Sequence, residues 1–526
     1  MRVLFRVDAS LEIGSGHVVR CLTLAQALHK LGMTCEFVCR QHVGHLIENI
    51  AQQGFVVHAL PKGRQGTWLG ATWQEDVRQT LESVGSQRYD WLIVDHYGLD
   101  ADWEKSLRCV AKKLLAIDDL ANRTHDADLV WDQNLGRELS DYVPWVRPSC
   151  EVHVGAMCAL LRPDFFMLRA ASRDRRSRKS ILRLMVAMGG VDKDNVTEKV
   201  LKSLQKMPDV LPSACKISVV MGHHAPWLQS VRAVSQSMPW KTEVCVGVTN
   251  MAELMTQADL AIAAVGTSAW ERCCLGLPTL AVILADNQQE GAKHLDLAGA
   301  VCLLPDHESM AHVLREKLLQ LQGSDLLLTM QDACYRVTDG RGTQRLARRL
   351  RVPWVNSNEG AVRTMSEDDL LTVLSWRNHP SVKRFMLTST DISQEEHRSW
   401  FQRVSQDNTR AMLLYVKEDQ SLGFVQFSGI YDACGTEWGF YVSPNAPKGT
   451  GFALGQAAIR FAFTQLAVDK IIGNVMEHNV ASLRFHEKLG FAQNPNKNNS
   501  SHMLSFELTF EVWLQCLEMQ HQEVVQ

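Results

Sequence analysis

Residues 1–32 read MRVLFRVDASLEIGSGHVVRCLTLAQALHKLG, and this stretch decides the fold of the first part of the chain. A short apolar run leads through a glycine-rich turn into an amphipathic pattern, which predicts a strand, a tight loop and a helix. Gly14 and Gly16 let a phosphate or a sugar approach the backbone closely, and the helix start offers free N–H groups. The loop does not match the dinucleotide-binding fingerprint, because Val19 stands where that pattern requires a third small residue.

The same alternation of strands and helices continues through roughly residue 340. Apolar runs such as WLIVDH (91–96) and LAIAAVG (260–266) are strand candidates, and each is followed by a longer helical pattern. This order is typical of βαβ units and mainly parallel sheets. The basic segment ASRDRRSRKSILR (171–183) interrupts it and is interpreted as a solvated linker or a helix end. We therefore predict two Rossmann-like halves, residues 1–170 and residues 171–350.

A second break follows at VPWVNSNEGA (352–361), where Pro, Asn, Ser and Gly end the periodicity. Beyond it, LGFVQFSGIYD and TEWGFYVSP resemble neighbouring antiparallel strands, preceded by an acid-capped helix. This order predicts an α+β region distinct from the front. We predict a linker over residues 351–360 and a third domain over residues 361–515, in line with a chain of 526 residues that is too long for one core.

Composition excludes several classes of function. Lys and Arg total 55 and Asp and Glu total 58, so a net charge of −3 provides no global field for nucleic acid or an anionic membrane. No apolar stretch reaches the roughly 18 residues of a membrane-spanning helix, and the N-terminus lacks the pattern of a secretory signal. Among the 14 cysteines, Cys35 and Cys39 come nearest to a zinc-ligand pair, and no second pair has zinc spacing. We expect a cytoplasmic protein that binds no metal, no nucleic acid and no membrane.

His17 adds chemistry to the glycine loop, because an imidazole at its mouth can take a proton from water. The residues 6–28 resemble the opening of the UDP-sugar hydrolases of pseudaminic acid biosynthesis, which remove UDP from a 2,4-diacetamido-2,4,6-trideoxy-altropyranose. Four further segments resemble this family in the same order, VDHYGLDADWE (94–104), IDDLANRTHDADLVWDQN (117–134), MGGVDKDNVT (188–197) and AVGTSAWERCCLGLPTLAVILADNQ (264–288). Five ordered blocks are a specific match.

This resemblance implies a GT-B fold, in which two Rossmann-like domains hold the substrate in their cleft. It also implies a mechanism without metal, in which His17 is the general base that activates water. Tyr97 then orients the sugar or the water. The implied UDP-sugar contacts are Gly14, Ser15, Gly16, Arg20, Gly266, Thr267, Ser268, Glu271, Asn287 and Gln288.

Structural alternatives stand beside these roles. His17 at the helix start can simply bond a backbone carbonyl, and Arg20 can simply brace the loop. Ser268 with Glu271 also forms the S-x-x-E pattern of a capping box, which is compatible with nucleotide binding. For Tyr97, a structural role is as well supported by the sequence as a catalytic one.

The last part of the chain carries a second set of motifs. PKGTGFALGQAAIRFAF (447–463) resembles the loop with which GNAT acetyltransferases hold the pyrophosphate of acetyl-CoA, and NVASLRFHEKLGF (479–491) resembles a downstream motif of that superfamily. The resemblance implies acetyl-CoA as co-substrate. Its implied contacts are Phe440, Tyr441, Val442, Lys448, Gly449, Thr450, Gly451, Ala453, Asn479 and Ser482.

The catalytic groups of this domain are less certain from sequence. His486 stands where GNAT enzymes often have a tyrosine that protonates the departing thiolate. A histidine can donate a proton near neutral pH, the thiolate can leave unaided, or His486 is structural. Glu437 is a candidate base for the substrate ammonium.

The two resemblances together imply a bifunctional enzyme. LSWRNHPSVKRFM (374–386) and EEHRSWF (395–401) resemble the acetyltransferase that acts on the UDP-4-amino sugar of the same pathway. The chain would then acetylate this amine and hydrolyse the UDP-diacetamido sugar, with UDP-sugar and acetyl-CoA as its small-molecule partners. Two alternatives are a GT-B glycosyltransferase with a fused GNAT domain, and a non-catalytic scaffold that binds nucleotide sugars.

Overall fold

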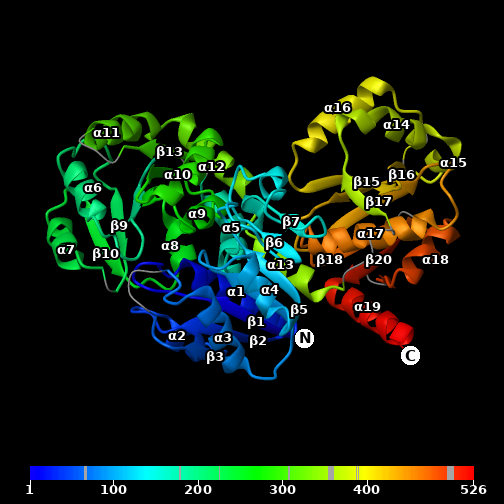
Figure 1. Cartoon of the computed structure of the whole chain (residues 1–526). Coiled ribbons are helices and arrows are strands. Elements are labelled where there is room, and N and C mark those ends of the chain that lie inside the picture. The colour runs from blue at the N-terminus through cyan, green and yellow to red at the C-terminus, as the bar shows by residue number, and fades with distance from the viewer. Residues whose placement is uncertain are drawn as a thin grey trace. The chain divides into compact units, whose positions relative to one another are not determined.

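A computed structural model describes residues 1–63, 68–176, 179–223, 225–305, 309–353, 360–386, 388, 390–494 and 503–525, without the side chains of residues 287 and 520–525. The chain divides into two compact units, Met1–Thr343 and Gln344–Gln526. The first unit holds two parallel sheets and the second a mixed sheet (Figure 1). This order confirms the predicted fold class. In the described part of the chain, no helix combines the length and the apolar character needed to cross a membrane.

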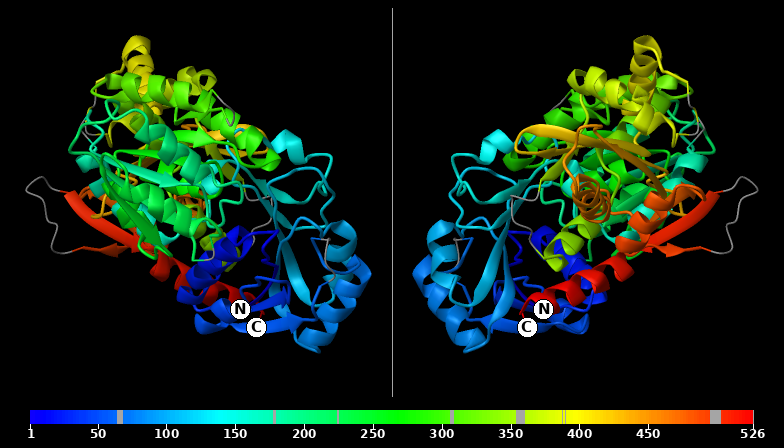
Figure 2. Two further views of the ribbon diagram at one scale, coloured as in Figure 1. Left: turned by 90° about the vertical axis from the view of Figure 1, so that its left-hand side faces the viewer. Right: turned by 90° about the vertical axis from the view of Figure 1, so that its right-hand side faces the viewer.

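The first sheet is parallel throughout, with the order β3-β2-β1-β4-β5-β6-β7. Its strands are β1 (Arg2–Val7), β2 (Thr34–Arg40), β3 (Val56–Leu60), β4 (Tyr89–Asp95), β5 (Ala111–Ile117), β6 (Leu129–Trp131) and β7 (Glu151–His153). Its helices are α1 (Gly16–Lys30), α2 (Ile47–Gln52), α3 (Trp73–Val84) and α4 (Ala101–Leu107), and they flank the strands on both faces (Figure 2). The strand order reverses between β1 and β4, and ligands of such sheets bind at this point.

β1 shows why a charged residue can lie in a buried central strand. Its sequence RVLFRV is buried from Val3 onward, as expected of a parallel strand covered on both faces. Arg6 is fully buried, and its guanidinium forms ion pairs with Asp8 and Asp76, both at 2.7 Å. The pairing compensates the charge that the strand buries.

The second sheet is also parallel, with the order β10-β9-β8-β11-β12-β13. Its strands are β8 (Arg183–Ala187), β9 (Lys216–Met221), β10 (Lys241–Val246), β11 (Leu260–Ala264), β12 (Thr279–Val282) and β13 (Val301–Leu304). The helices of this part are α5 (Pro163–Arg175), α6 (Val196–Gln205), α7 (Leu228–Gln236), α8 (Met251–Gln257), α9 (Ser268–Cys274), α10 (Gln289–Leu297), α11 (Met310–Leu321) and α12 (Asp325–Val337). α13 (Gly342–Arg351) follows and belongs from Gln344 onward to the second unit.

The basic segment 171–183 is not a solvated linker over its whole length. Residues 171–175 are the last turns of α5, as the helix-end interpretation predicted, and Ser172 is buried. Arg176 is 3% exposed, and its guanidinium donates to backbone carbonyls of Met255, Ala258 and Leu275. These bonds tie α5 to the second sheet, so the predicted boundary after residue 170 falls inside a helix.

The mixed sheet has the order β14-β15-β16-β17-β18-β20-β19. Its strands are β14 (Ala361–Thr364), β15 (Arg410–Lys417), β16 (Gln420–Ser428), β17 (Thr436–Val442), β18 (Lys470–Met476), β19 (Ala492–Gln493) and β20 (Met503–Thr509). Its helices are α14 (Leu370–Asn378), α15 (Pro380–Lys383), α16 (Gln394–Ser405), α17 (Thr450–Thr464), α18 (Val480–Lys488) and α19 (Phe510–Val525). Residues 354–359 of the predicted linker lie outside the described residues.

β17 and β18 form the one parallel pair recorded in the described part of this sheet, and they separate early. Their pairing joins only Thr436 to Ile471 and Glu437 to Ile472. From residue 439 onward, the edge of β17 that faces β18 has no strand pairing among the described residues. The sheet therefore opens where Phe440, Tyr441 and Val442 lie.

Candidate functional site

His17 and Asp95 meet at the point where the first sheet reverses its strand order. β1 and β4 are parallel neighbours, with Val7 opposite Asp95, and His17 follows β1 at the start of α1. The Nδ1 atom of His17 lies 2.5 Å from Oδ1 of Asp95. A carboxylate can only accept, so Nδ1–H is the donor and Nε2 is left as the basic nitrogen. The alternative in which His17 simply bonds a backbone carbonyl therefore does not describe this structure.

Arg20 binds the same carboxylate. Its Nε donates to Oδ2 of Asp95 and its Nη2 to Oδ1, both at 2.6 Å, and its Nη1 donates to Asp119 at 3.1 Å. Arg20 is 4% exposed. Burial opposes the ionisation of Asp95, yet Arg20 and His17 hold the pKa of this carboxyl well below its usual range. The arrangement favours the bracing role of Arg20 over a contact with the UDP-sugar.

Tyr97 forms one wall beside the imidazole. Its ring meets the ring of His17 edge-on, with centroids 4.7 Å apart, and Trp68 lies 5.4 Å away on its other side. Burial, reinforced by Asp119, raises the pKa of Tyr97 far above its usual value, so the phenol keeps its proton. A neutral phenol beside the basic nitrogen can orient water or a sugar hydroxyl by hydrogen bonding.

The predicted glycine loops of the two halves come together. Gly14 has a φ of +81°, a conformation that favours glycine, and Ser15 is the N-cap residue of α1 without a side-chain capping bond. A side-chain carbon at Gly16 would lie 3.9 Å from the side chain of Thr267, which belongs to the loop after β11. The loop that carries His17 therefore faces the loop predicted to hold the nucleotide.

A buried cation supports this second loop. Gly266, Thr267 and Ser268 follow β11, and Ser268 is the first residue of α9. Arg272 is 1% exposed, and it donates to Ser268 Oγ and to Ala264 O at 3.0 and 2.8 Å. The capping box is absent, because Thr267 is the N-cap residue and no side-chain capping bond forms. The oxygen of Ser268 bonds Arg272 instead.

The other predicted nucleotide contacts lie near this loop in sequence. Burial raises the pKa of Glu271 to about 7, although Arg162 and Arg272 lower it. The Oε1 of Gln288 accepts from Leu284 N at 2.9 Å and so closes the turn after β12, which leaves its amide nitrogen for a ligand. The side chain of Asn287 lies outside the described residues.

In the second unit, the loop predicted to bind acetyl-CoA leads directly into α17. Gly449 has a φ of +92° and is the N-cap residue of α17. Its carbonyl accepts from the N–H groups of Phe452 and Ala453, at 3.0 and 3.2 Å, and Thr450 N donates to Pro447 O. Lys448 is exposed, and a side-chain carbon at Gly451 would lie 3.8 Å from Val442 of β17. The loop therefore lies against the open part of β17.

His486 already uses both ring nitrogens. Its Nδ1–H donates to Ser482 O at 2.8 Å, and its Nε2 accepts from the indole N–H of Trp438 at 3.2 Å. The residue is 2% exposed, and burial lowers its pKa. A side-chain carbon at Gly473 would lie 2.4 Å from Nε2, so the ring fills space that only a glycine leaves. This geometry favours the structural alternative for His486.

Glu437 and Asn479 lie at the two ends of the opening. Glu437 is exposed at the last position where β17 pairs with β18. Its carboxylate accepts a hydrogen bond from Asn474 Nδ2 at 3.2 Å. The Oδ1 of Asn479 accepts from Ser482 N at 3.2 Å and caps α18. The side-chain oxygen of Asn479, a residue predicted to bind acetyl-CoA, is therefore used to cap α18.

Sequence reasoning missed a polar cluster on the face of the mixed sheet that bears Tyr441. Arg377 of α14 and His397 of α16 each have a buried nitrogen without a hydrogen-bond partner in the part of the chain that the structure describes. Burial, followed by the charge of Arg377, lowers the pKa of His397. Trp400 stacks on His397 with ring centroids 5.1 Å apart. Both residues lie in segments with family resemblance, which is the signal that could have identified them.

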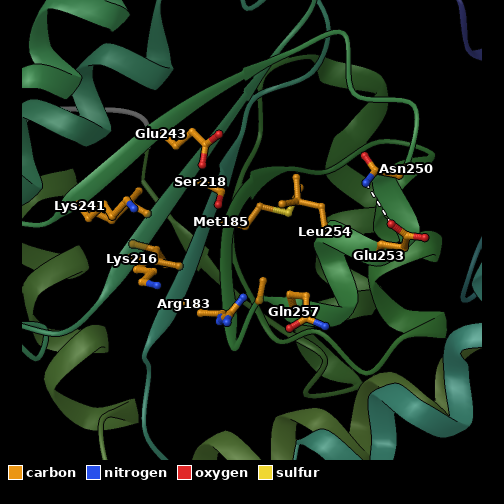
Figure 3. Close-up of a pocket in the computed structure, with 13 residues that line it drawn as sticks. Arg183, Met185, Lys216, Ser218, Lys241, Glu243, Asn250, Glu253, Leu254 and Gln257 are labelled. Atoms are coloured by element: carbon orange, nitrogen blue, oxygen red, sulfur yellow. Dashed lines mark hydrogen bonds between the residues drawn. The ribbon is translucent and has the colours of Figure 1, made fainter.

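A surface cavity of about 400 Å³ lies at the other edge of the second sheet, where strands begin. Arg183, Lys216 and Lys241 are the first residues of β8, β9 and β10, and they lie along one side of it, opposite Glu253 (Figure 3). No predicted site residue lines this cavity. Among the described residues, no group of three or more His, Cys, Asp or Glu side chains is placed to hold a metal ion.

Comparisons with known families match both parts of the chain. The model of the glycosyltransferase family 28 C-terminal domain matches residues 183–344, and that of the acetyltransferase (GNAT) domain matches residues 361–492. The crystal structure of MurG from Acinetobacter baumannii has a TM-score of 0.50, with 15% identity, over 66% of this chain and 99% of that chain. This likeness confirms the predicted GT-B-like fold.

Two proteins from Campylobacter jejuni match the two parts separately. The UDP-2,4-diacetamido-2,4,6-trideoxy-beta-L-altropyranose hydrolase is 26% identical over 300 residues, 57% of this chain and 97% of the hydrolase. The acetyltransferase PseH is 30% identical over 128 residues, 24% of this chain and 79% of PseH. The predicted fusion of a hydrolase-like part with a GNAT part is confirmed.

Proposed function

The chain belongs, through its residues 361–492, to the GNAT acetyltransferase family that includes PseH, and from this premise we propose a bifunctional enzyme of pseudaminic acid biosynthesis. The second unit acetylates the 4-amino group of UDP-4-amino-4,6-dideoxy-N-acetyl-β-L-altrosamine with acetyl-CoA. The first unit hydrolyses UDP-2,4-diacetamido-2,4,6-trideoxy-β-L-altropyranose to the free sugar and UDP. The enzyme acts in the cytoplasm. The relatives in Campylobacter jejuni support both assignments.

In the hydrolase, Nε2 of His17 takes a proton from water as the water oxygen attacks carbon 1 of the sugar and UDP departs. Asp95 holds the Nδ1–H tautomer, so the basic nitrogen points away from the carboxylate. Such a base contributes about 10²- to 10⁴-fold in rate. The observation that carries this proposal is the His17–Asp95 pair in the loop that faces Thr267.

The nucleotide is held by backbone and by few charges. Gly14, Ser15 and Gly16 lie against the sugar, and Gly266, Thr267 and Ser268 hold the pyrophosphate with the cation of Arg272 behind them. Glu271 accepts hydrogen bonds from the ribose, and Gln288 donates its amide N–H to the sugar or the phosphate. The same role is proposed for Asn287.

In the acetyltransferase, the pantetheine arm of acetyl-CoA lies along the open edge of β17 at Phe440, Tyr441 and Val442. The loop from Lys448 to Ala453 holds the pyrophosphate. Glu437 removes a proton from the substrate ammonium, directly or through water. His486 has no free nitrogen to donate, so the thiolate leaves without its help.

The acceptor of the acetyl group lies on the face that bears Arg377 and His397. Their unpartnered nitrogens offer hydrogen bonds to a phosphate or a hydroxyl, and Trp400 offers an aromatic surface. Arg377 is half-buried and its Nη2 donates to Thr388, so Nη1 is the guanidinium nitrogen that, within the described residues, is free to bind a phosphate.

His17→Ala tests the hydrolase. The variant should release UDP from the diacetamido substrate at least about 100-fold more slowly, because the base is gone, while its affinity for the UDP-sugar stays within about threefold of wild type. A rate within threefold of wild type would refute the general-base assignment.

A glycosyltransferase is the second candidate, because the fold resembles MurG and residues 183–344 match a glycosyltransferase family. Reaction in ¹⁸O-labelled water separates the two. Hydrolysis places the label at carbon 1 of the free sugar, whereas transfer to another acceptor leaves the product unlabelled. A scaffold would bind UDP-sugar and acetyl-CoA in calorimetry and turn over neither.

A further inference from the structure

The side chains of His17, Arg20 and Cys21 bond one buried carboxylate in the first unit, that of Asp95. Asp95 is 1% exposed, and each of its oxygens bonds Arg20, while Oδ1 also accepts from His17. Nη2 of Arg20 lies 3.2 Å from Nδ1 of His17. The base proposed for hydrolysis is thus in contact with both a carboxylate and a guanidinium.

The carboxylate alone would make His17 a poor base. A negative charge 2.5 Å from an imidazole nitrogen stabilises the protonated ring, and low exposure strengthens this attraction. A general base must be unprotonated at the working pH. Asp95 therefore orients His17, but its charge alone would also favour the doubly protonated ring, which cannot act as a base.

Arg20 places the opposite charge beside the same nitrogen, with Nη2 at 3.2 Å from Nδ1 of His17. It cannot lose its proton in a protein, and its fork geometry covers both oxygens of Asp95. Its charge both neutralises the carboxylate and opposes a positive imidazole directly.

The other groups that face His17 do not replace Arg20. Tyr97 stays protonated, since burial raises its pKa, and burial lowers the pKa of His96 to about 4, so both are neutral near pH 7. Asp119 is negative, but it binds Nη1 of Arg20 and not the imidazole. Arg20 is the cation recorded in contact with His17 among the described residues.

We propose that Arg20 is a positioning residue that keeps His17 unprotonated at neutral pH by binding both oxygens of Asp95. The pair Asp95 and Arg20 fixes the tautomer and the direction of the ring without trapping a proton on it. This inference rests on the proposed hydrolase function for its catalytic meaning, but the protonation state of His17 can be measured without any turnover.

The test compares Arg20→Gln with Arg20→Lys and a matched control. Arg108 also bridges two carboxylates of the first unit, Asp126 and Asp128, and it has no contact with His17, so Arg108→Gln is the control. The rate constant kcat/KM for UDP release is measured from about pH 5 to about pH 9. The acetyltransferase activity of the same chain and its circular dichroism report on folding.

In Arg20→Gln, the acidic limb of the profile should move up by about one pH unit or more, because the imidazole binds its proton more tightly. Arg20→Lys restores the charge and should recover at least half of the shift, and Arg108→Gln should leave the limb within about 0.3 unit of wild type. A folded Arg20→Gln enzyme whose rate falls equally at every pH would overturn the inference.

An NMR titration separates this inference from the proposed function. The ring signal of His17, assigned with His17→Gln, is followed against pH in the free protein. If the wild type hydrolyses no UDP-sugar but the midpoint of His17 rises in Arg20→Gln, the proposed function fails and the inference stands. If the midpoint does not move, the inference is wrong whatever the activity.

Discussion

Asp95 shows how much chemistry the last residue of a strand can carry. It directly precedes His96 and Tyr97, and the sequence marked all three as the end of a strand. Its partner His17 is 78 positions away along the chain, so only the parallel pairing of β1 with β4 brings them together. The pairing of strands distant in sequence cannot be obtained from local periodicity. His17 was identifiable as a candidate base from its motif, and the carboxylate that binds it was not.

Asp95→Asn should separate orientation from binding. An amide can offer its N–H to Nδ1 and so favour the wrong tautomer of His17, and it leaves Arg20 without a counter-charge. We expect kcat for UDP release to fall by about 10²- to 10⁴-fold, while the affinity for the UDP-sugar changes by less than about threefold. Steady-state kinetics and calorimetry measure the two quantities. A loss confined to affinity would contradict the orienting role.

Glu271 should make nucleotide affinity depend on pH. Burial raises the pKa of its carboxyl to about 7. Below that pH the group is protonated and must lose a proton before it accepts two ribose hydrogen bonds, whereas above it the carboxylate is ready. Affinity for the UDP-sugar should therefore rise by up to about tenfold between about pH 6 and about pH 8.

Calorimetry in the His17→Ala background measures this dependence without turnover, and a nucleotide sugar avoids the titrating terminal phosphate of UDP. Glu271→Gln should bind more weakly above pH 7 and should show no such rise. An unchanged pH dependence in Glu271→Gln would assign the proton to another group.

His486→Phe should weaken the second unit without removing its chemistry. The phenyl ring fills the same space but removes the side-chain bond to Ser482 O and leaves the indole N–H of Trp438 without its acceptor, which costs roughly 1–3 kcal/mol. Denaturation followed by tryptophan fluorescence should show this loss. Acetyl transfer by the folded variant should stay within about threefold of wild type over the alkaline range. Acetyl transfer that is 100-fold slower, in a variant whose stability depends on alkaline pH as the wild type's does, would instead identify His486 as a proton donor.

At the scale of elements, long periodic strands were predictable and short ones were not. β1, β4 and β11 are apolar runs that the sequence identified, because buried parallel strands are continuous in hydrophobicity. β6 and β7 have three residues each, too few to show a period. β10 (KTEVCV) lies at the edge of its sheet, and none of its residues is fully buried, so its first half is polar.

Arg176 could not be placed from sequence, since it lies in a run of basic residues that is typical of a solvated segment. Its guanidinium joins α5 to the end of α8 and to the turn after α9 through carbonyls of Met255, Ala258 and Leu275. Burial lowers its pKa to about 10, so it keeps its charge at neutral pH. The C-terminal carbonyls of α8 favour a cation there.

Arg176→Met should destabilise the first unit by roughly 3–5 kcal/mol, because the carbonyls of Met255, Ala258 and Leu275 each lose a hydrogen bond to a buried guanidinium. Arg175→Met is the matched control, since the neighbouring Arg175 is partly exposed and pairs with Asp259, and it should cost about 1 kcal/mol or less. Hydrogen exchange of the full chain, read on peptides from α5 and α8, localises the loss. Equal protection in both variants would contradict the role of Arg176.

For the whole molecule, the modest net charge of −3 has a structural counterpart. The predicted phosphate contacts are glycine loops and helix starts at Gly14–Gly16, Gly266–Ser268 and Gly449–Gly451, with the single buried cation of Arg272 behind one of them. Backbone N–H groups hold phosphates without a basic surface. A net charge of −3 predicts no global field for nucleic acid, but it could not tell where two phosphate ligands would lie.

Two sites on one chain predict that the two reactions can be removed separately. Given acetyl-CoA and the UDP-4-amino sugar, His17→Ala should accumulate the UDP-diacetamido sugar, because acetylation needs no residue of the first unit. Gly449→Ala strains a position with a φ of +92° by roughly 1–2 kcal/mol and should raise the KM for acetyl-CoA, while hydrolysis of the pre-acetylated substrate stays within about threefold of wild type. Mass spectrometry of the products distinguishes the cases. If His17→Ala also abolished acetylation, the two activities would not be independent, and a fusion of two self-sufficient enzymes would be the wrong description of the chain.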